Sequence, residues 1–349
     1  MSIKILHILS STTFSGAENV VCQIIEMFAN MGYEMAYCSP DGQISEVLEE
    51  RNIQYFPLKT FSVLEIKKVI KSYRPSIIHS HDAAAAVYSS FANIRLPIVV
   101  HIHGNHMNMR KITIKSILVR FLSFRWRKII WVSKSSYEDF VFKKSVSEKS
   151  IVLPNIILKS DIEYRLLTAS KFENTYDCIV LGRINHIKNP LRAISIFREV
   201  VKQIPSLKVV FVGDGDLLEK CKQEIAKSNL SNNIEMIGYY NNPIRVLNNS
   251  KILIMTSIYE GTPMCALEAM ALGKPIVSTP TDGIVDIIEQ NVSGFYSCED
   301  TQLVSKIINL IYDKKLYSQM SSEALKRFTK LMNIENYKSV LKDIYINHQ

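Results

Sequence analysis

The segment 256–283 constrains the fold of this chain more than any other stretch. The apolar run 252–255 precedes it and predicts a buried parallel strand, and the strong helix formers from 266 to 272 predict a helix that ends at Gly273. A strand, a tight turn and a helix in this order place free amide groups and the positive end of a helix dipole at the turn. Residues 256–263 are therefore a candidate binding site for an anion such as a phosphate.

Two carboxylates flank this turn. Glu260 lies on it, and Glu268 follows eight residues later, about two turns along the predicted helix. Acids beside a phosphate are unfavourable unless they accept hydrogen bonds from hydroxyl groups, as the diols of a sugar or a ribose provide. The combination predicts a nucleotide sugar as ligand. Taken singly, Glu260 could equally cap the helix and Glu268 could be a solvated helix residue.

Size and composition predict a globular protein of two domains. The chain has 349 residues, of which 47% are hydrophobic and 21% charged, and a formal net charge of +9 suggests an anionic partner. The six cysteines are scattered without metal-ligand spacing, which is typical of reduced thiols in a cytosolic protein. No apolar run reaches the length of a spanning helix, and the short run 3–9 predicts a first strand, not a secretion signal.

Strand and helix patterns alternate along both halves of the chain, which predicts an α/β protein with doubly wound parallel sheets. We expect a first domain over residues 1–165, a second domain over 166–331 and a final helix within 332–349. The polar stretch 159–175 is expected to be a linker. Ligands of such sheets bind at the carboxyl ends of the strands.

Histidines follow two of the strands predicted in the first half. His79 and His81 belong to one stretch, and His101 and His103 to another. A metal site is disfavoured because the two stretches belong to different strands and only Asp82 supplies an acid. His103, which precedes a glycine, is expected to hydrogen-bond a sugar, whereas His79 and His101 are expected to be structural.

Two cations share one predicted loop of the second half. Arg183 and Lys188 follow a strand, so they could bind a pyrophosphate and stabilise it as it departs. Further on, Asp214 and Asp216 have the spacing of a D-x-D metal motif, but the glycine-rich context favours a helix cap over a divalent ion.

A basic segment without acids spans residues 83–137. The stretch 112–124 has an apolar stripe with basic residues beside it, which predicts a basic amphipathic helix. We expect the segment 110–128, from Arg110 to Lys128, to contact an anionic membrane surface. The alternative is a docked helix with a solvated basic face. Nucleic acid is a less favoured partner, because no recognisable binding module accompanies the charge.

Together these motifs resemble those of the retaining glycosyltransferases of family 4. The Glu260-to-Glu268 block, a Glu-x7-Glu arrangement, is the most specific of them. The first loop departs from the usual Gly-Gly with Ser15–Gly16, and Asp286 stands where a glutamate is usual. The other matching motifs, in chain order, are Gly16-Ala17-Glu18, His79-Ser80-His81, His103-Gly104, Val132-Ser133, Pro154-Asn155, Gly182-Arg183, Lys188-Asn189, Gly213-Asp214-Gly215 and Gly238.

The resemblance implies the GT-B fold, in which two Rossmann-like doubly wound parallel-sheet domains enclose an interdomain donor cleft and the last helix crosses back to the first domain. It also implies a metal-independent hexosyltransferase without a cofactor, in which a donor phosphate oxygen takes the acceptor's proton. Arg183 and Lys188 would neutralise the leaving diphosphate, and Glu268 would bind the ribose. Glu260 would hold the transferred sugar, and His103 would contact it from the other domain. The remaining donor-binding positions would be Gly16, Gly182, Gly213, Gly261, Thr262, Pro263, Met264 and Cys265.

The leading hypothesis is a cytoplasmic enzyme, peripheral on the inner face of the plasma membrane. It would transfer a sugar, most simply from a UDP-sugar, to a lipid-linked or polysaccharide acceptor. One alternative is a non-catalytic scaffold that partners an active transferase, which the retained charged residues argue against. Another is a metal-dependent transferase that uses Asp214 and Asp216.

Overall fold

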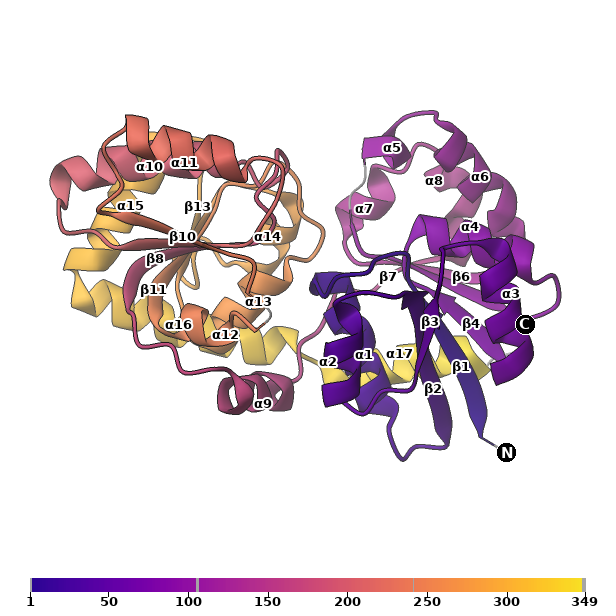
Figure 1. The fold of residues 1–349 in the computed structure, drawn as a ribbon. Coiled ribbons are helices and arrows are strands. Elements are labelled where there is room, and N and C mark those ends of the chain that lie inside the picture. Colours follow the sequence, from indigo (N-terminus) through magenta and orange to yellow (C-terminus); the bar gives the residue numbers. More distant parts are fainter. Residues whose placement is uncertain (1, 105–106, 241, 347–349) are drawn as a thin grey trace. The chain divides into compact units, whose positions relative to one another are not determined.

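The computed structural model describes residues 2–104, 107–240 and 242–346, and it contains two compact units. The first unit comprises residues 1–156 and 334–349, and the second comprises 157–333. Each unit is built around one sheet with helices on both faces (Figure 1). Every strand pair in both sheets is parallel, which confirms the predicted α/β class with two doubly wound domains.

The sheet of the first unit has seven strands in the order β3-β2-β1-β4-β5-β6-β7. The order reverses direction between β1 and β4, and the carboxyl ends of these two strands mark the place where such sheets bind ligands. The strands are β1 (Ile3–Ile8), β2 (Tyr33–Pro40), β3 (Tyr55–Leu58), β4 (Ile77–Ser80), β5 (Ile98–Ile102), β6 (Trp126–Trp131) and β7 (Ser150–Val152).

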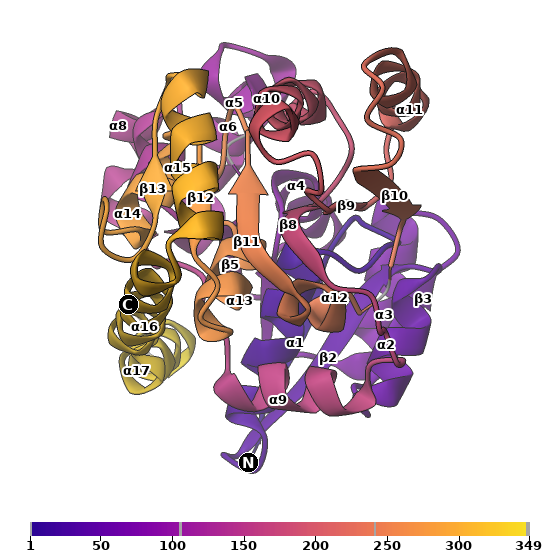
Figure 2. The same ribbon diagram turned by 90° about the vertical axis from the view of Figure 1, so that its left-hand side faces the viewer.

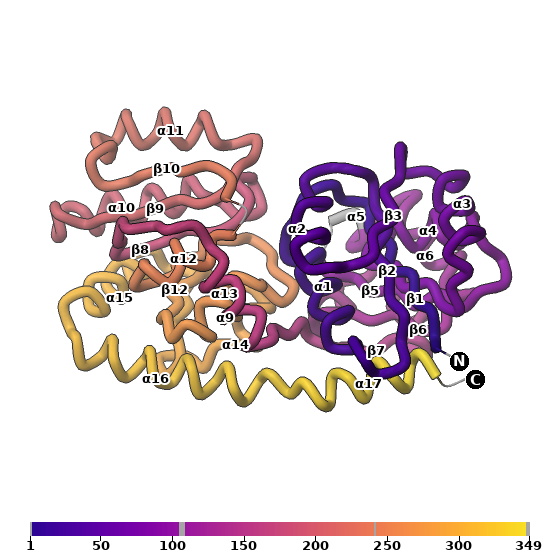
Figure 3. Tube along the Cα trace, turned by 60° about the horizontal axis from the view of Figure 1, so that its bottom comes forward, coloured from indigo at the N-terminus to yellow at the C-terminus, as the bar shows by residue number. Residues whose placement is uncertain are grey.

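Alternate strand residues of the first unit face different helices, because successive side chains of a strand point to opposite faces. Leu6 and Ile8 share a core with α3 (Val63–Tyr73), α4 (Ala83–Ala92) and α6 (Ile114–Leu122). The other face carries α1 (Gly16–Phe28), α2 (Ile44–Glu50) and α17 (Ile334–Ile346), the last of which runs along the first unit in Figure 3. Short helices complete this unit: α5 (Met107–Arg110), α7 (Lys134–Glu138) and α8 (Lys143–Val146), with 3-10 turns at Ser123–Arg125 and Ser147–Lys149.

The six-stranded sheet of the second unit repeats the same strand order, β10-β9-β8-β11-β12-β13, with its reversal between β8 and β11. Figure 2 shows α10, α11 and α15 on one face of this sheet, where they share an apolar core. The strands are β8 (Tyr176–Leu181), β9 (Val209–Val212), β10 (Ile234–Gly238), β11 (Ser250–Met255), β12 (Ile276–Ser278) and β13 (Phe295–Tyr296). The helices are α9 (Lys159–Thr168), α10 (Pro190–Gln203), α11 (Leu218–Lys227), α12 (Ile244–Asn248), α13 (Met264–Ala271), α14 (Asp282–Ile287), α15 (Asp300–Tyr312) and α16 (Lys314–Leu331).

The domain boundary differs from the prediction at 165/166, because the chain enters the second unit at Ile157. The predicted linker 159–175 begins with helix α9, which packs on α12 and α13. Arg165 fixes this position through Glu268 of α13 and Asn242. Polar composition suggested a linker, but the polar side chains of α9 are used to dock the helix.

Candidate functional site

The candidate site of the second unit lies where β8 and β11 end, at the reversal of strand order. Residues 182–189 connect β8 to α10. Thr256, which follows β11, donates its hydroxyl to the carbonyl oxygens of Lys188 at 3.2 Å and Asn189 at 2.9 Å. The amide of Ile258 donates to the carbonyl of Ile187 at 2.8 Å. The β8 loop is therefore fastened to the end of β11, which sets the position of Lys188.

Lys188 and Glu260, both of which were predicted to follow strands of the second half, form an ion pair at this place. Lys188 Nζ lies 2.6 Å from Glu260 Oε1, and the Ser257 hydroxyl donates to the same oxygen at 2.6 Å. The Lys188 side chain is 24% exposed and that of Glu260 is 10% exposed. Burial lowers the pKa of Lys188, but the charge of Glu260 and its hydrogen bond to Lys188 act against this effect, and the net pKa is raised. Lys188 is therefore a permanent cation at neutral pH.

Arg183 supplies a second cation on the same loop. Its side chain is exposed, and it lines a pocket together with Gly182, Lys188, Thr256 and Ser257. Arg183 carries the same charge as Lys188 and lies close enough to it to lower the pKa of Lys188. Two close cations at strand ends suit a ligand that carries more than one negative charge.

Glycines let the loops of this site approach one another by backbone contact. A Cβ on Gly213 would lie 1.9 Å from the carbonyl oxygen of Gly182, and a Cβ on Gly283 would lie 1.5 Å from that of Gly261. Gly182 and Gly213 also have φ angles of +142° and +143°, which other residues rarely adopt. Both glycines shape the site; their contact with a donor stays a prediction.

The turn before α13 is buried, and the helix begins at Met264. Pro263 is the N-cap and Met264 the first helical residue, because the first intrahelical bond joins the Ala266 amide to the Pro263 carbonyl. Thr262 precedes the cap. Burial raises the pKa of the Cys265 thiol to about 12, although Lys188 acts against it, so Cys265 is a neutral thiol.

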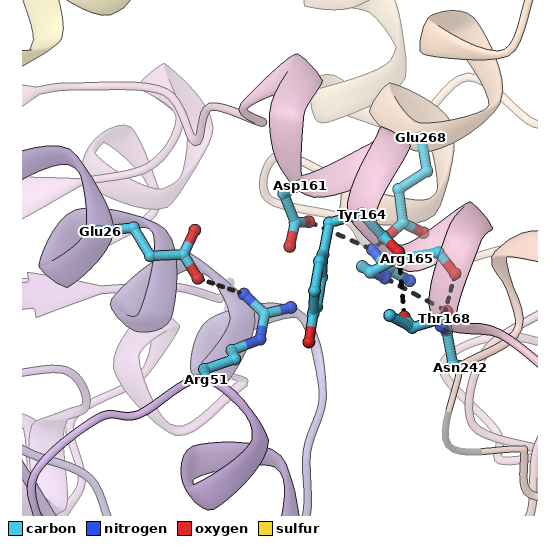
Figure 4. Close-up of polar contacts among 8 residues, drawn as sticks. All are labelled: Glu26, Arg51, Asp161, Tyr164, Arg165, Thr168, Asn242 and Glu268. Atoms are coloured by element: carbon cyan, nitrogen blue, oxygen red, sulfur yellow. Dashed lines mark hydrogen bonds and ion pairs between the residues drawn. The ribbon is translucent and has the colours of Figure 1, made fainter.

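Glu268 lies on α13 and binds Arg165, a residue that the sequence analysis missed. Arg165 Nη1 lies 2.6 Å from Glu268 Oε1, and Asp161 lies on the same helix as Arg165 (Figure 4). Both side chains of the Arg165–Glu268 pair are buried. Asp161 and Arg165 stand four residues apart, the spacing of a helical ion pair, and this signal could have identified α9.

Asp214 and Asp216 lie in a tight turn. Asp214 Oδ1 accepts a hydrogen bond from the Gly215 amide at 2.7 Å. Helix α11 begins at Leu218 with Leu217 as its cap, so neither aspartate caps it as predicted. Among the described residues, the groups with metal-ligand geometry include neither aspartate.

Five histidines of the first unit lie on three adjacent strands or just beyond them. Because β4 pairs with both β1 and β5, the stretches that the sequence analysis kept apart lie side by side. His7, which that analysis overlooked, joins them from β1. These histidines form two triads, and within each triad one ring nitrogen of every residue lies within 4.8 Å of the other two. The separation of the two stretches along the chain is therefore no argument against a metal site. The triads are His7, His79 and His81, and His81, His101 and His103.

A directed hydrogen-bond chain links three of these histidines. His7 Nδ1 lies 2.8 Å from His81 Nε2, and His81 Nδ1 lies 3.0 Å from His103 Nε2. At the far end, His7 Nε2 lies 3.4 Å from the Met35 sulfur. A thioether can only accept, so His7 must donate from Nε2, and each following ring must then carry its proton on Nε2 as well. Burial lowers the pKa of His7 and of His103 to about 3, so these rings are neutral at pH 7.

Gly16 begins helix α1 at the carboxyl side of β1, after the cap residue Ser15. The Ser15 amide donates to Glu18 Oε2 at 3.0 Å, and the Ser15 hydroxyl binds the same oxygen. The Gly16-Ala17-Glu18 motif thus has a capping role, and burial raises the pKa of Glu18. A phosphate contact at Gly16 stays a prediction.

The basic segment 110–128 places apolar side chains on the surface. Only part of the predicted apolar stripe is buried. Leu122 is buried, whereas Ile114, Ile117 and Phe121 are 81%, 48% and 68% exposed. Not all of the basic residues are solvated, since Arg125 donates to the carbonyls of Ser90 and Asn93. None of the described helices is long and apolar enough to cross a membrane.

Comparison with protein families gives two matches. The model described as Glycosyltransferase Family 4 matches residues 14–157, and the model described as Glycosyl transferases group 1 matches residues 168–327. The Escherichia coli UDP-Gal:alpha-D-GlcNAc-diphosphoundecaprenol alpha-1,3-galactosyltransferase is 23% identical over 99% of this chain and 97% of its own length. The Staphylococcus aureus capsular polysaccharide biosynthesis glycosyltransferase CapH is 26% identical over 76% of this chain and 78% of its own.

Solved structures confirm the predicted GT-B fold. Anabaena HepE, crystallised with UDP and glucose, superposes with a TM-score of 0.84 at 19% identity, over 98% of both chains. S. aureus TarM, in a complex that contains alpha-GlcNAc-glycerol and UDP, gives a TM-score of 0.81 at 13% identity, over 99% of this chain and 100% of its own.

Proposed function

The chain belongs to glycosyltransferase family 4, and from that premise we propose that it transfers a sugar from a UDP-sugar to a lipid-linked or polysaccharide acceptor, with retention of the anomeric configuration. The observation that carries the proposal is the Lys188–Glu260 pair beside Arg183, at the strand ends of the second unit. Similarity to proteins that were crystallised with UDP supports this donor, and similarity to the E. coli undecaprenol-linked galactosyltransferase supports this acceptor class.

In the proposed reaction, the bond between the anomeric carbon and the diphosphate oxygen breaks, and its electron pair leaves with the diphosphate. Arg183 and Lys188 bind the departing charge, as a metal ion does in other transferases. The acceptor hydroxyl attacks from the same face, and its proton passes to an oxygen of the leaving diphosphate. This step needs neither a metal ion nor a separate protein base. Glu260 and the backbone of 261–265 hold the sugar.

A donor screen tests this proposal. Nucleotide release is measured with UDP-, GDP- and ADP-sugars in the presence of membrane lipid extract, with and without EDTA, and NMR determines the anomeric configuration of the product. We expect turnover with a UDP-sugar, unchanged by EDTA, and a retained configuration. An inverted product would contradict the mechanism, and loss of turnover in EDTA would favour the metal-dependent alternative through Asp214 and Asp216.

We also propose that the segment 110–128 holds the enzyme on the anionic inner face of the plasma membrane, which would place it in the cytoplasm. The exposed apolar side chains of α6 can enter the lipid interface while Lys111, Lys115 and Arg120 meet the headgroups. Co-sedimentation with vesicles that contain phosphatidylglycerol should fall strongly in Phe121→Glu. Leu64→Glu is the matched control, because Leu64 is 72% exposed on α3 of the same unit. Equal vesicle binding by both variants would contradict the proposed surface.

A further inference from the structure

Arg165 connects the first helix of the second unit to a carboxylate of the proposed donor site. Its Nη1 atom lies 2.6 Å from Glu268 Oε1 and 3.5 Å from Asp161 Oδ2. Its backbone is fastened too, because Asn242 Nδ2 donates to the Arg165 carbonyl at 2.8 Å (Figure 4). Arg165 therefore has little freedom to leave Glu268.

Burial makes this contact consequential. The side chains of Asp161, Arg165 and Glu268 are 1%, 7% and 9% exposed. A buried carboxylate without a partner is strongly unfavourable, so removal of Arg165 would leave Glu268 free to turn toward water or another donor. The two carboxylates of Asp161 and Glu268 and the single cation of Arg165 together carry a net charge of −1. Their surroundings therefore repel a phosphate but accept a hydroxyl donor.

We infer that Arg165 is a positioning residue for donor recognition. It occupies Oε1 of Glu268, and so reserves Oε2 for the hydroxyl groups of the donor ribose. The hydrogen bond and the ion pair with Arg165 are both made through Oε1. The inference rests on the proposed function, in which Glu268 binds ribose and the cations Arg183 and Lys188 bind the diphosphate. The arginine thus acts on the ribose end of the donor through Glu268.

Ribose discrimination separates this role from a purely structural one. The full chain is titrated with UDP and with its 2′,3′-dideoxy analogue by calorimetry. Wild type should bind UDP at least tenfold more tightly, because a site built for hydroxyl groups rejects a ligand that lacks them. Arg165→Met should lose about tenfold in UDP affinity and bind the analogue as wild type does, so that the affinity ratio approaches one. Arg165→Lys should give an intermediate ratio, since lysine keeps the charge but lacks the planar fork.

Two further variants complete the experiment. Glu268→Gln should lower the ratio as Arg165→Met does, and the double variant should lower it no further, because both act on one contact. Arg192→Met is the matched control: it breaks the partly exposed Arg192–Asp300 pair of the same unit, 2.8 Å long, and should keep the wild-type ratio.

The outcomes separate the inference from the function on which it rests. A wild-type ratio in Arg165→Met, or in Arg165→Lys if the methionine variant does not fold, would overturn the positioning role even if thermal stability falls. Wild type that binds both ligands equally would overturn the assigned role of Glu268. Wild type that fails to bind UDP would contradict the proposed donor itself.

Discussion

The two units share a strand order but differ in the chemistry at their strand ends. In the first unit, the residues at and beyond the ends of β1, β4 and β5 include five histidines, all with lowered pKa values. In the second, the ends of β8 and β11 carry Arg183, Lys188 and Glu260. The same topology thus carries a neutral polar site in the first unit and a charged site in the second. The fold fixes where a ligand can bind, and the side chains decide which ligand.

The histidines are neutral and Lys188 is charged because their neighbouring side chains differ. The histidines bind one another, Met35 and Tyr345, and no carboxylate among the described residues forms an ion pair with them, so burial keeps them uncharged. Lys188 has Glu260 at 2.6 Å, so it keeps its charge despite burial. Neutral imidazoles can bind hydroxyl groups, whereas the two neighbouring cations Arg183 and Lys188 can bind a diphosphate.

Loss of the charged pair should give the largest effect. Lys188→Ala and Glu260→Ala should each lower kcat/KM about 100-fold or more, because preorganised charges act on the transition state. Steady-state kinetics with the identified donor measures this, and circular dichroism checks folding. Lys202→Ala is the control, since Lys202 forms an exposed pair with Glu199 on α10 of the same unit. Full turnover in either site variant would refute the assigned roles.

Acid should destabilise the neutral site in a defined window. The pKa of His7 and of His103 is about 3 in the folded chain, against about 6.5 for a free histidine. The unfolded chain therefore binds more protons between these values, so the free energy of unfolding falls as pH drops from about 6.5 toward 3.

Thermal unfolding between pH 7.5 and pH 4.5 measures this acid effect. We expect Tm to decrease through the window, with a smaller decrease in His103→Gln. His186→Gln is the control, because His186 is exposed and should leave the slope unchanged. The same slope in His103→Gln as in wild type would show that His103 is charged or solvated.

How far the sequence predicts this molecule depends on whether a feature is local. Alternation of strands and helices predicts both sheets, and strand-end positions predict the approach of Lys188 to Glu260. The histidine cluster was missed because it requires the neighbours of β4, which no local pattern contains. Arg165 was missed for the same reason: its partner is 103 residues away. The stripe of α6 was found, but periodicity does not tell which side faces solvent.

Loss of a neutral contact should have a moderate effect. His103→Ala should lower kcat/KM about tenfold, the loss of one good hydrogen bond, without abolishing turnover. Kinetics at saturating donor separates the effect on KM from that on kcat. A loss as large as that in Lys188→Ala would mean that the two sites do not differ in kind.

The smallest effect is a shift in proton position. Histidine ¹⁵N spectra should show the Nε2-H tautomer for His7, His81 and His103, because Met35 can only accept. Met35→Leu removes that acceptor and should populate the second tautomer of His7. Nδ1-H signals from all three rings in the wild-type protein would contradict the proposed direction of the chain.

UDP affinity tests the division of labour between the units most directly. Calorimetric titration of the full chain should show UDP binding in wild type and in His103→Ala, and its loss in Lys188→Ala. Unchanged UDP binding by Lys188→Ala, with loss in His103→Ala, would contradict the placement of the diphosphate site in the second unit.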